Sequence, residues 1–157
     1  MQAVVCYYSW HGHTTEAGKA IANAVHGQEV AVVEVKKRRG LFGWLAGGRD
    51  AMRGRDTPIQ PLNVNWNAYD TVFIGSPIWG SATAPAVNSL IQQAELAGKR
   101  VYVFATSGGE LKQEVLDKFA AAVTAKGATV VGRFSAVSTN TQPGDIARLA
   151  REWAEKL

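Results

Sequence analysis

A chain of 157 residues is long enough to bury one core but too short for two of ordinary size, so a single domain over residues 1–157 is expected. Apolar residues make up 46% and charged residues 19%, and no apolar run approaches the roughly 18 residues of a membrane span. These values argue against a membrane-spanning protein and against a disordered one. The first ten residues lack the basic and apolar segments of a secretion signal, so the cytoplasm is the expected location.

Cysteine and histidine are scarce, which limits disulfide and metal chemistry. Cys6 is the single cysteine, so an internal disulfide is excluded, and its place within an apolar run predicts a buried side chain. The histidines are His11, His13 and His26, and their spacing is not typical of a zinc site. We therefore predict no metal site.

The positive charge is concentrated in one segment. The net charge is +4, yet residues 36–55 alone carry +6 and the rest of the chain carries −2. The basic residues of this segment are Lys36, Lys37, Arg38, Arg39, Arg49, Arg53 and Arg55. The body of the protein is therefore mildly acidic, and one insert makes the chain basic.

Short apolar runs alternate along the chain with segments of helical periodicity. A continuous apolar run such as residues 3–8 is typical of a parallel strand covered on both faces. Apolar residues three and four positions apart, as at Ala17, Ile21 and Ala24, are typical of a helix. In chain order we predict a strand at 3–8, a helix at 14–26, strands at 29–35 and 71–75, a helix at 84–97, a strand at 100–105, a helix at 110–126, a strand at 128–137 and a helix at 145–157.

This alternation predicts an α/β fold, with a parallel sheet, right-handed crossovers and helices on both faces. Five strands are compatible with the order 2-1-3-4-5 and with a small Rossmann-type order, and periodicity does not separate the two. In open sheets of either kind, ligands bind at the carboxyl ends of the strands beside the switch point, here the first and third strands. The loops at that edge therefore decide the function.

The loop after the first strand has the features of a phosphate site. Gly12 permits a tight turn, and Ser9, Thr14 and Thr15 offer hydroxyl groups. The helix that follows supplies unpaired N–H groups and a positive dipole end. The loop matches neither GxGxxG nor GxxxxGK[ST], which argues against a dinucleotide or a nucleoside triphosphate. A simple helix cap is the alternative.

Two further loops follow the third and fourth strands. Trp79 lies in a Pro/Gly-containing loop at the edge of the sheet, where it could stack on a planar ring, and Gly80 would allow the adjacent peptide to rotate. The alternative is that Trp79 packs against a neighbouring helix. Residues 106–110 form a third small polar loop whose backbone amides could approach a ligand.

Taken together, the three loops resemble those of the flavodoxin family. Residues 7–14 are similar to its phosphate loop, with hydroxyl residues around a glycine, although His11 stands where the family often has threonine. Residues 75–80 are similar to its second loop, in which an aromatic residue followed by glycine flanks the isoalloxazine ring. Residues 104–109 resemble its third loop.

The resemblance implies a short-chain flavodoxin-like domain that binds flavin mononucleotide (FMN) non-covalently. The expected fold has three layers, α/β/α, with a five-stranded parallel sheet of order 2-1-3-4-5. We predict no catalytic residue, and the resemblance makes Gly80 the candidate for the carbonyl that turns toward flavin N5. Carried over residue by residue, the phosphate would be held by Ser9, His11, Gly12, His13 and Thr14, and the ring by Ser76, Pro77, Ile78, Trp79, Gly80, Thr106, Ser107, Gly108 and Gly109.

The insert between the second and third strands, residues 36–61, departs from a minimal fold. Residues 41–45 have a partial apolar face beside many arginines, whereas five glycines between positions 40 and 54 weaken helix formation. The third loop has no aromatic residue for the second ring face, so the insert is a candidate lid. It could also be a docking patch for an acidic redox partner, a site for an anionic substrate, a surface that rests on a membrane, or a solvated insert.

Three functions remain to be compared. The first is an electron-transfer protein that cycles FMN through a semiquinone between redox partner proteins. The second is an FMN-dependent oxidoreductase, of the NAD(P)H:quinone reductase or protoporphyrinogen-oxidase-like kind, acting at an exposed flavin face. The third is a binding domain that has lost the flavin. The loops favour flavin binding, and the lack of an evident catalytic carboxylate or cysteine favours the carrier. Nucleic acid is not predicted as a partner, because no recognised motif accompanies the arginines.

Overall fold

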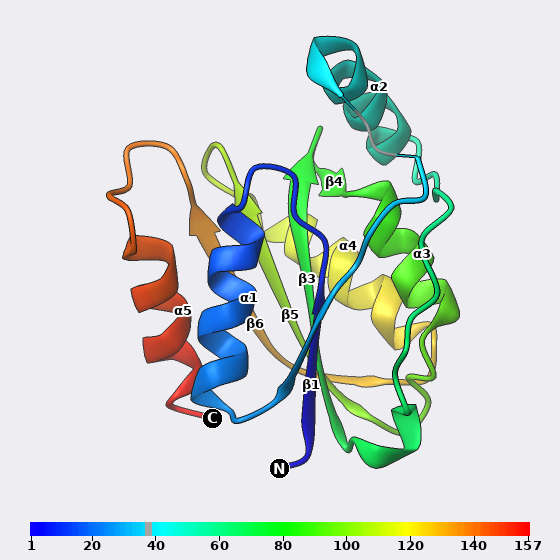
Figure 1. The fold of residues 1–157 in the computed structure, drawn as a ribbon, viewed down its shortest axis with the longest axis vertical. Coiled ribbons are helices and arrows are strands. Elements are labelled where there is room, and N and C mark those ends of the chain that lie inside the picture. Colours follow the sequence, from blue (N-terminus) through cyan, green and yellow to red (C-terminus); the bar gives the residue numbers. More distant parts are fainter. Residues whose placement is uncertain (37–38) are drawn as a thin grey trace.

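A parallel sheet lies between two layers of helices in the computed structural model of the protein, which describes residues 1–36 and 39–157 (Figure 1). Two basic residues of the insert, Lys37 and Arg38, lie outside the described residues. The elements are β1 (Ala3–Tyr7), α1 (His13–Ala24), β2 (Gln28–Ala31), α2 (Gly40–Met52), a 3-10 turn (Trp66–Ala68), β3 (Thr71–Trp79), β4 (Ala82–Thr83), α3 (Pro85–Gln93), β5 (Arg100–Ser107), α4 (Gln113–Thr124), β6 (Thr129–Val137) and α5 (Asp145–Ala154).

The strand order confirms the predicted topology. Within the described residues, the parallel strands are arranged β2-β1-β3-β5-β6, which is the order 2-1-3-4-5 when only parallel strands are counted. The additional strand, β4, has two residues and pairs antiparallel with the end of β3. The periodicity could not predict β4, because two residues are too few to show an alternation.

Two strands extend further than predicted. β3 continues from Gly75 to Trp79, and β5 continues to Ser107. The parallel register between them is unbroken, since Ser76 pairs with Ala105 and Pro77 with Thr106. Residues predicted as loops are therefore the last residues of strands, and the sheet itself holds them in place.

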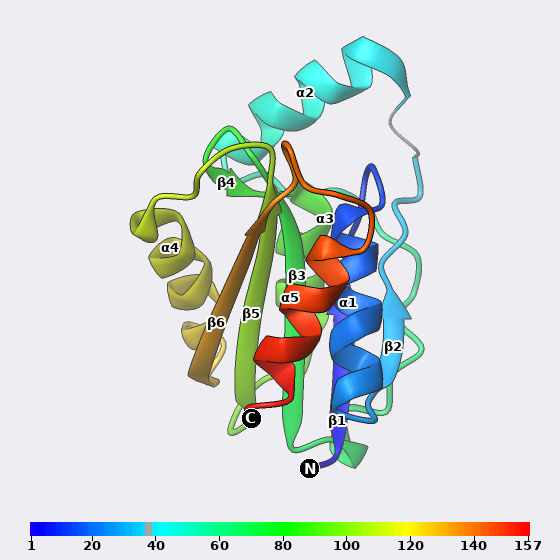
Figure 2. The ribbon, with the colours of Figure 1, turned by 90° about the vertical axis from the view of Figure 1, so that its left-hand side faces the viewer.

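The two faces of the sheet carry separate cores. On one face, α1 and α5 pack over the alternate residues Val5, Phe73 and Phe104. On the other face, α3 and α4 pack over Val4, Ile74 and Val103. Figure 2 shows α1 and α5 side by side in front of the sheet, with α3 and α4 behind it or at its edge. The prediction of helices on both faces is confirmed, since neighbouring residues of β1, β3 and β5 are buried in opposite directions.

The insert contains the helix α2, Gly40–Met52. The sequence alone did not decide between a helix and a loop, because the segment is rich in glycine. Gly47 and Ala51 are its buried residues, and the helix contacts β3, β4 and α3. Small side chains on that stripe allow close approach to the body, so tertiary packing compensates for the poor helix propensity of glycine. Figures 1 and 2 show α2 above the carboxyl ends of the strands, projecting beyond the sheet.

Cys6 is fully buried in β1, as predicted. Burial raises the pKa of its thiol from 9.0 to about 12, because the interior disfavours the thiolate. Its contribution to stability is therefore fully present below about pH 9 and is lost as the pH rises toward 12.

We expect a thiol-specific reagent to modify Cys6 only in unfolded protein. At pH 8, the labelled fraction measured in increasing urea should follow the unfolding transition measured by circular dichroism. Complete labelling in native buffer, before any loss of the dichroism signal, would contradict the burial of this thiol.

Candidate functional site

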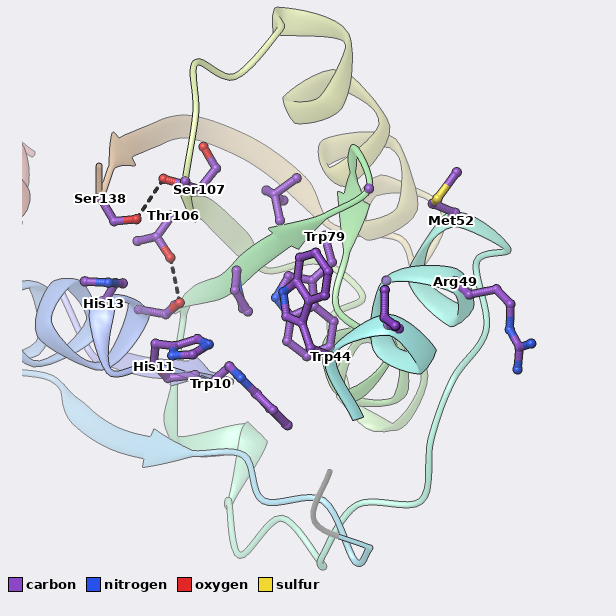
Figure 3. A pocket seen from close by; sticks show the side chains of 18 residues that line it. Trp10, His11, His13, Trp44, Arg49, Met52, Trp79, Thr106, Ser107 and Ser138 are labelled. Atoms are coloured by element: carbon purple, nitrogen blue, oxygen red, sulfur yellow. Dashed lines mark hydrogen bonds between the residues drawn. The ribbon is translucent and has the colours of Figure 1, made fainter. Parts of the chain in front are cut away.

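A cavity of about 610 Å³ opens at the carboxyl edge of the sheet, beside the switch point between β1 and β3 (Figure 3). This volume falls in the range of small-molecule sites. Its walls come from the loop before α1, the ends of β3 and β5, and α2. The predicted site residues that line it are Ser9, His11, His13, Thr14, Pro77, Ile78, Trp79, Gly80, Thr106, Ser107 and Gly108.

Three predicted site residues lie outside this lining. Gly12 forms the turn before α1, with a φ of 96°, and acts through the shape of the loop. Ser76 is buried, and its hydroxyl donates to the carbonyl of Pro77 and accepts the N–H of Ala84. Gly109 lies in a separate, smaller pocket on the β5 side. The structure gives Ser76 a role in fixing the end of β3.

The first loop presents polar groups to one end of the cavity. The hydroxyl oxygen of Ser9 accepts the N–H groups of Gly12 at 3.1 Å and Thr15 at 3.2 Å, and its own proton remains available to a ligand. For the N–H groups of His13 and Thr14, at the start of α1, the structure shows no acceptor among the residues it describes. Unpaired amides at the positive end of a helix dipole are features that protein sites for phosphate groups share.

Hydroxyl contacts join the first and third loops. The hydroxyl oxygens of Thr14 and Thr106 lie 2.8 Å apart, and both side chains are buried. Beside them, the hydroxyl of Ser138 donates to the carbonyl of Ser107 at 3.1 Å. Figure 3 shows both contacts on the same side of the cavity. They hold the ends of β5 and β6 in fixed positions relative to α1.

The opposite end of the cavity is aromatic. Trp79 is half-buried and has Tyr8 and Trp10 as ring neighbours, with centroids 5.9 Å and 5.7 Å away and planes at 82° and 90°. Both contacts are edge-to-face, whereas core rings such as Phe73 and Tyr102 stack at 12°. Among the described rings, none stacks in parallel on Trp79. Trp79 therefore both packs against the core and presents an aromatic surface to the cavity.

The sequence did not point to Trp10 or Ser138 as site residues. Trp10 follows the first strand, so it is also an aromatic residue in a loop at the carboxyl edge of the sheet, as Trp79 was predicted to be. Ser138 directly follows the predicted strand 128–137, so the rule that ligands bind at the carboxyl ends of strands could have found it. Both residues line the cavity.

The insert supplies the last wall of the cavity. The residues of α2 that line the cavity are Trp44, Leu45, Gly48, Arg49 and Met52. The Arg49 side chain points away from Trp79 in Figure 3. A flat apolar molecule in the cavity would thus have aromatic groups of the body and the apolar surface of α2 around it.

The contact between Gly80 and Met52 joins α2 to the end of β3. Gly80 has a φ of 55°, and a Cβ atom there would lie under 3.0 Å from the Met52 side chain. We expect Gly80→Ala to destabilise the protein by about 1–2 kcal/mol, because a left-handed conformation is strained for alanine and Met52 must move. Urea unfolding measures this cost.

Met52→Ala in the same chain should restore part of that loss, because it removes the atoms in the way. Gly109→Ala is the matched control, since a Cβ there meets no atom within 4 Å. If Gly80→Ala unfolds at the same urea concentration as the parent protein, the contact does not constrain α2.

The chemistry of the lining fits a phosphate ester that also carries a flat ring. Amide and hydroxyl groups occupy one end and aromatic and aliphatic groups the other, so an anionic tail and a flat ring would each meet a matching surface. FMN has this form. Among the described residues, no three His, Cys, Asp or Glu side chains are grouped so that they could hold a metal ion.

A parallel sheet of this order between two layers of helices, with a glycine turn after β1 and an aromatic residue at the end of β3, is the arrangement of a flavodoxin-like protein. The family model described as Flavodoxin matches residues 2–134. The chain belongs to the flavodoxin family.

Solved structures share this fold. A flavoprotein from Lactobacillus acidophilus NCFM, crystallised in complex with FMN, is 23% identical with a TM-score of 0.73, over 85% of this chain and 92% of its own. A flavoprotein from Bacteroides uniformis is 23% identical with a TM-score of 0.71, over 99% and 96%. The two-electron reduced flavodoxin of Megasphaera elsdenii is 18% identical with a TM-score of 0.62, over 99% and 100%. The search of curated proteins found no match.

Proposed function

We propose that the protein binds FMN in this cavity and transfers electrons through it. The observation that carries the proposal is the pairing, within one cavity, of the amide and hydroxyl groups around Ser9 with the aromatic surface of Trp79. Membership of the flavodoxin family and the FMN complex of the Lactobacillus relative support it.

The polar end would hold the phosphate. The N–H groups of His13 and Thr14 and the hydroxyl of Ser9 are the donors, and α1 adds the positive end of its dipole. Arg49 is the only lysine or arginine among the described lining residues, and it points away from this end. In this proposal, recognition of the phosphate would depend on backbone amides and hydroxyl groups and would not require a lysine.

The aromatic end would hold the ring. Trp79 offers a stacking surface, and Ile78, Trp10 and the apolar residues of α2 exclude water around it. Bound FMN supplies the redox chemistry, while these residues position the ring and set the polarity of its surroundings. An apolar environment disfavours added negative charge on a bound ring, which lowers its reduction potential.

The lining favours an electron carrier over an enzyme. Among its described residues there is no Asp, Glu, Cys, Lys or Tyr that could transfer a proton to or from a substrate. His11 and His13 are the titratable groups other than Arg49, and both side chains are exposed. One-electron exchange with a partner needs no such group.

One observation favours the alternative, an FMN-dependent oxidoreductase. α2 adds Trp44, Leu45 and Met52 to the cavity, an apolar wall that a carrier exposing its flavin edge to proteins does not need. Such a wall could hold a flat organic substrate, such as a quinone, against the ring. Basic residues around α2 would favour an anionic substrate or an acidic redox partner on this side. The predicted compartment for either function is the cytoplasm.

Titration of the apoprotein with FMN tests the proposal. Quenching of FMN fluorescence should saturate at one FMN per chain, and the yellow complex should then accept electrons from dithionite in two separate steps. NADH and NADPH should leave the colour unchanged. Failure to bind FMN would overturn the assignment, and rapid bleaching by a nicotinamide would select the oxidoreductase.

A further inference from the structure

One face of α2 is apolar and basic and is exposed to solvent, with Met52 beside Gly80 as its contact with the body of the protein. At about 100° per residue, the side chains of this face fall within about 120° of the helix circumference. They are Leu41, Phe42, Leu45, Arg49, Met52 and, directly after the helix, Arg53, and we call them the α2 outer face. All six are exposed, and Phe42, at 86%, is the most exposed large apolar side chain described.

The buried side of the helix lies opposite this face. Gly47 and Ala51 are its buried residues, and both belong to its C-terminal half. The N-terminal half, with Leu41 and Phe42, overhangs the carboxyl edge of the sheet in Figures 1 and 2. Leu41 and Phe42 expose apolar surface to water, which is unfavourable in free energy. Exposed apolar patches of this kind are typical of interaction surfaces.

Residues 36–55, which include α2, carry a net charge of +6, and few of the described arginines there have an acidic partner. Arg55 pairs with Asp50 at 3.4 Å. For Arg39, Arg49 and Arg53, the structure shows no ion pair among the residues it describes. The complementary surface is therefore anionic as well as apolar.

We propose that the α2 outer face docks the protein on the surface of an anionic lipid membrane. Leu41, Phe42 and Leu45 would enter the boundary between headgroups and acyl chains, while Arg49 and Arg53 would meet lipid phosphates. No helix among the described residues is long and apolar enough to cross a bilayer.

Two features favour lipid over an acidic protein as the occupant. Leu41 and Phe42 are consecutive, so they point about 100° apart around the helix. A bilayer receives such a spread of side chains without a shaped groove. In addition, Leu45, Arg49 and Met52 belong both to this face and to the cavity lining, so the face continues into the cavity wall. Docking would bring the cavity close to a phase that dissolves apolar redox compounds.

Vesicle sedimentation with the full chain tests the proposal. We expect binding to vesicles of equal parts phosphatidylglycerol and phosphatidylcholine, at least about tenfold tighter than to phosphatidylcholine alone and weakened by salt. Leu41→Ser with Phe42→Ser should weaken binding by at least about tenfold, because both side chains lose their transfer from water. Arg53→Gln should weaken it about fivefold.

The control substitutions for vesicle binding are at the C-terminus, which lies at the end of the molecule opposite α2 in Figures 1 and 2. Lys156→Gln and Leu157→Ser remove an exposed charge and an exposed apolar side chain there, and they should leave vesicle binding unchanged. Because Leu41 and Phe42 do not line the cavity, their replacement should also leave FMN affinity unchanged. The test is thus independent of whether FMN binding itself is confirmed.

Three outcomes would overturn the proposal. The first is an absence of binding to anionic vesicles at low salt. The second is binding that the Leu41→Ser, Phe42→Ser variant retains in full, which would reduce the contact to simple charge attraction. The third is self-association that the same double variant abolishes while vesicles are not bound, which would assign the face to a second copy of the chain. In the first case, capture of the parent protein but not of the double variant by an immobilised acidic protein would assign the face to a protein partner.

Discussion

Replacement of Trp79 by alanine is expected to weaken FMN binding by roughly 10- to 100-fold. Stacking of a flat heterocycle on an aromatic side chain contributes about 1–3 kcal/mol, and about 1.4 kcal/mol corresponds to a tenfold change in affinity. Trp79 is the aromatic residue at the end of β3, and its described ring neighbours meet it edge to face. In the proposed complex, the FMN ring would stack in parallel on Trp79. Fluorescence titration of the apoprotein measures the change.

Two further variants locate the effect. Trp79→Phe keeps an aromatic surface and should lose less than tenfold. Trp153→Phe is the matched control, because Trp153 stacks on Phe134 in the α5 core, with centroids 5.3 Å apart, and does not line the cavity. Equal FMN affinity for the parent and Trp79→Ala proteins would show that the ring lies elsewhere.

The second large effect is expected on stability, from Gly75→Ala in β3. Gly75 pairs with Tyr7 of β1 and with Phe104 of β5, and the two rings meet over it with centroids 6.4 Å apart. A Cβ atom at Gly75 would lie under 3.0 Å from the ring of Phe104, which is fully buried. Overpacking of this kind costs typically 1–3 kcal/mol, and the central position of β3 predicts about 3 kcal/mol. For a domain of this size, the melting temperature should fall by about 6–12 °C.

A double-mutant cycle tests this cause. Phe104→Leu removes the ring atoms in the way, so Gly75→Ala should cost less in that background than in the parent. Gly109→Ala adds a methyl group where no atom lies within 4 Å, and its melting temperature should stay close to that of the parent. Additive losses in the cycle would show that the clash with Phe104 is not the reason.

The sheet could be predicted because its strands obey a simple rule. Residues of β1, β3 and β5 are buried on both faces, so they appear in the sequence as continuous apolar runs. Where the strands end could not be predicted, because Ser76 and Pro77 are typical of loops. The register with β5 keeps them in the sheet, and that constraint comes from a segment about 30 residues away in sequence.

For the insert, the sequence could not predict the secondary structure. Residues 40–54 contain enough glycine to leave helix and loop open, and only the contact of Gly47 and Ala51 with the body decides between them. The prediction of an apolar segment near the cavity was possible, since residues 41–45 are apolar. Which of those side chains would face the cavity depended on the helix and on its attachment, and neither is encoded locally.

The attachment of α2 through a short stripe of small residues leaves its outer surface under little structural constraint. Substitutions on that surface leave the sheet and the anion-binding turn untouched, so they can accumulate without loss of the fold. Natural variation should therefore change where such a protein operates sooner than it changes the chemistry of its cavity. By the same reasoning, an engineer could exchange Leu41, Phe42 and Arg53, which do not line the cavity, and keep the cavity wall that the rest of the helix supplies.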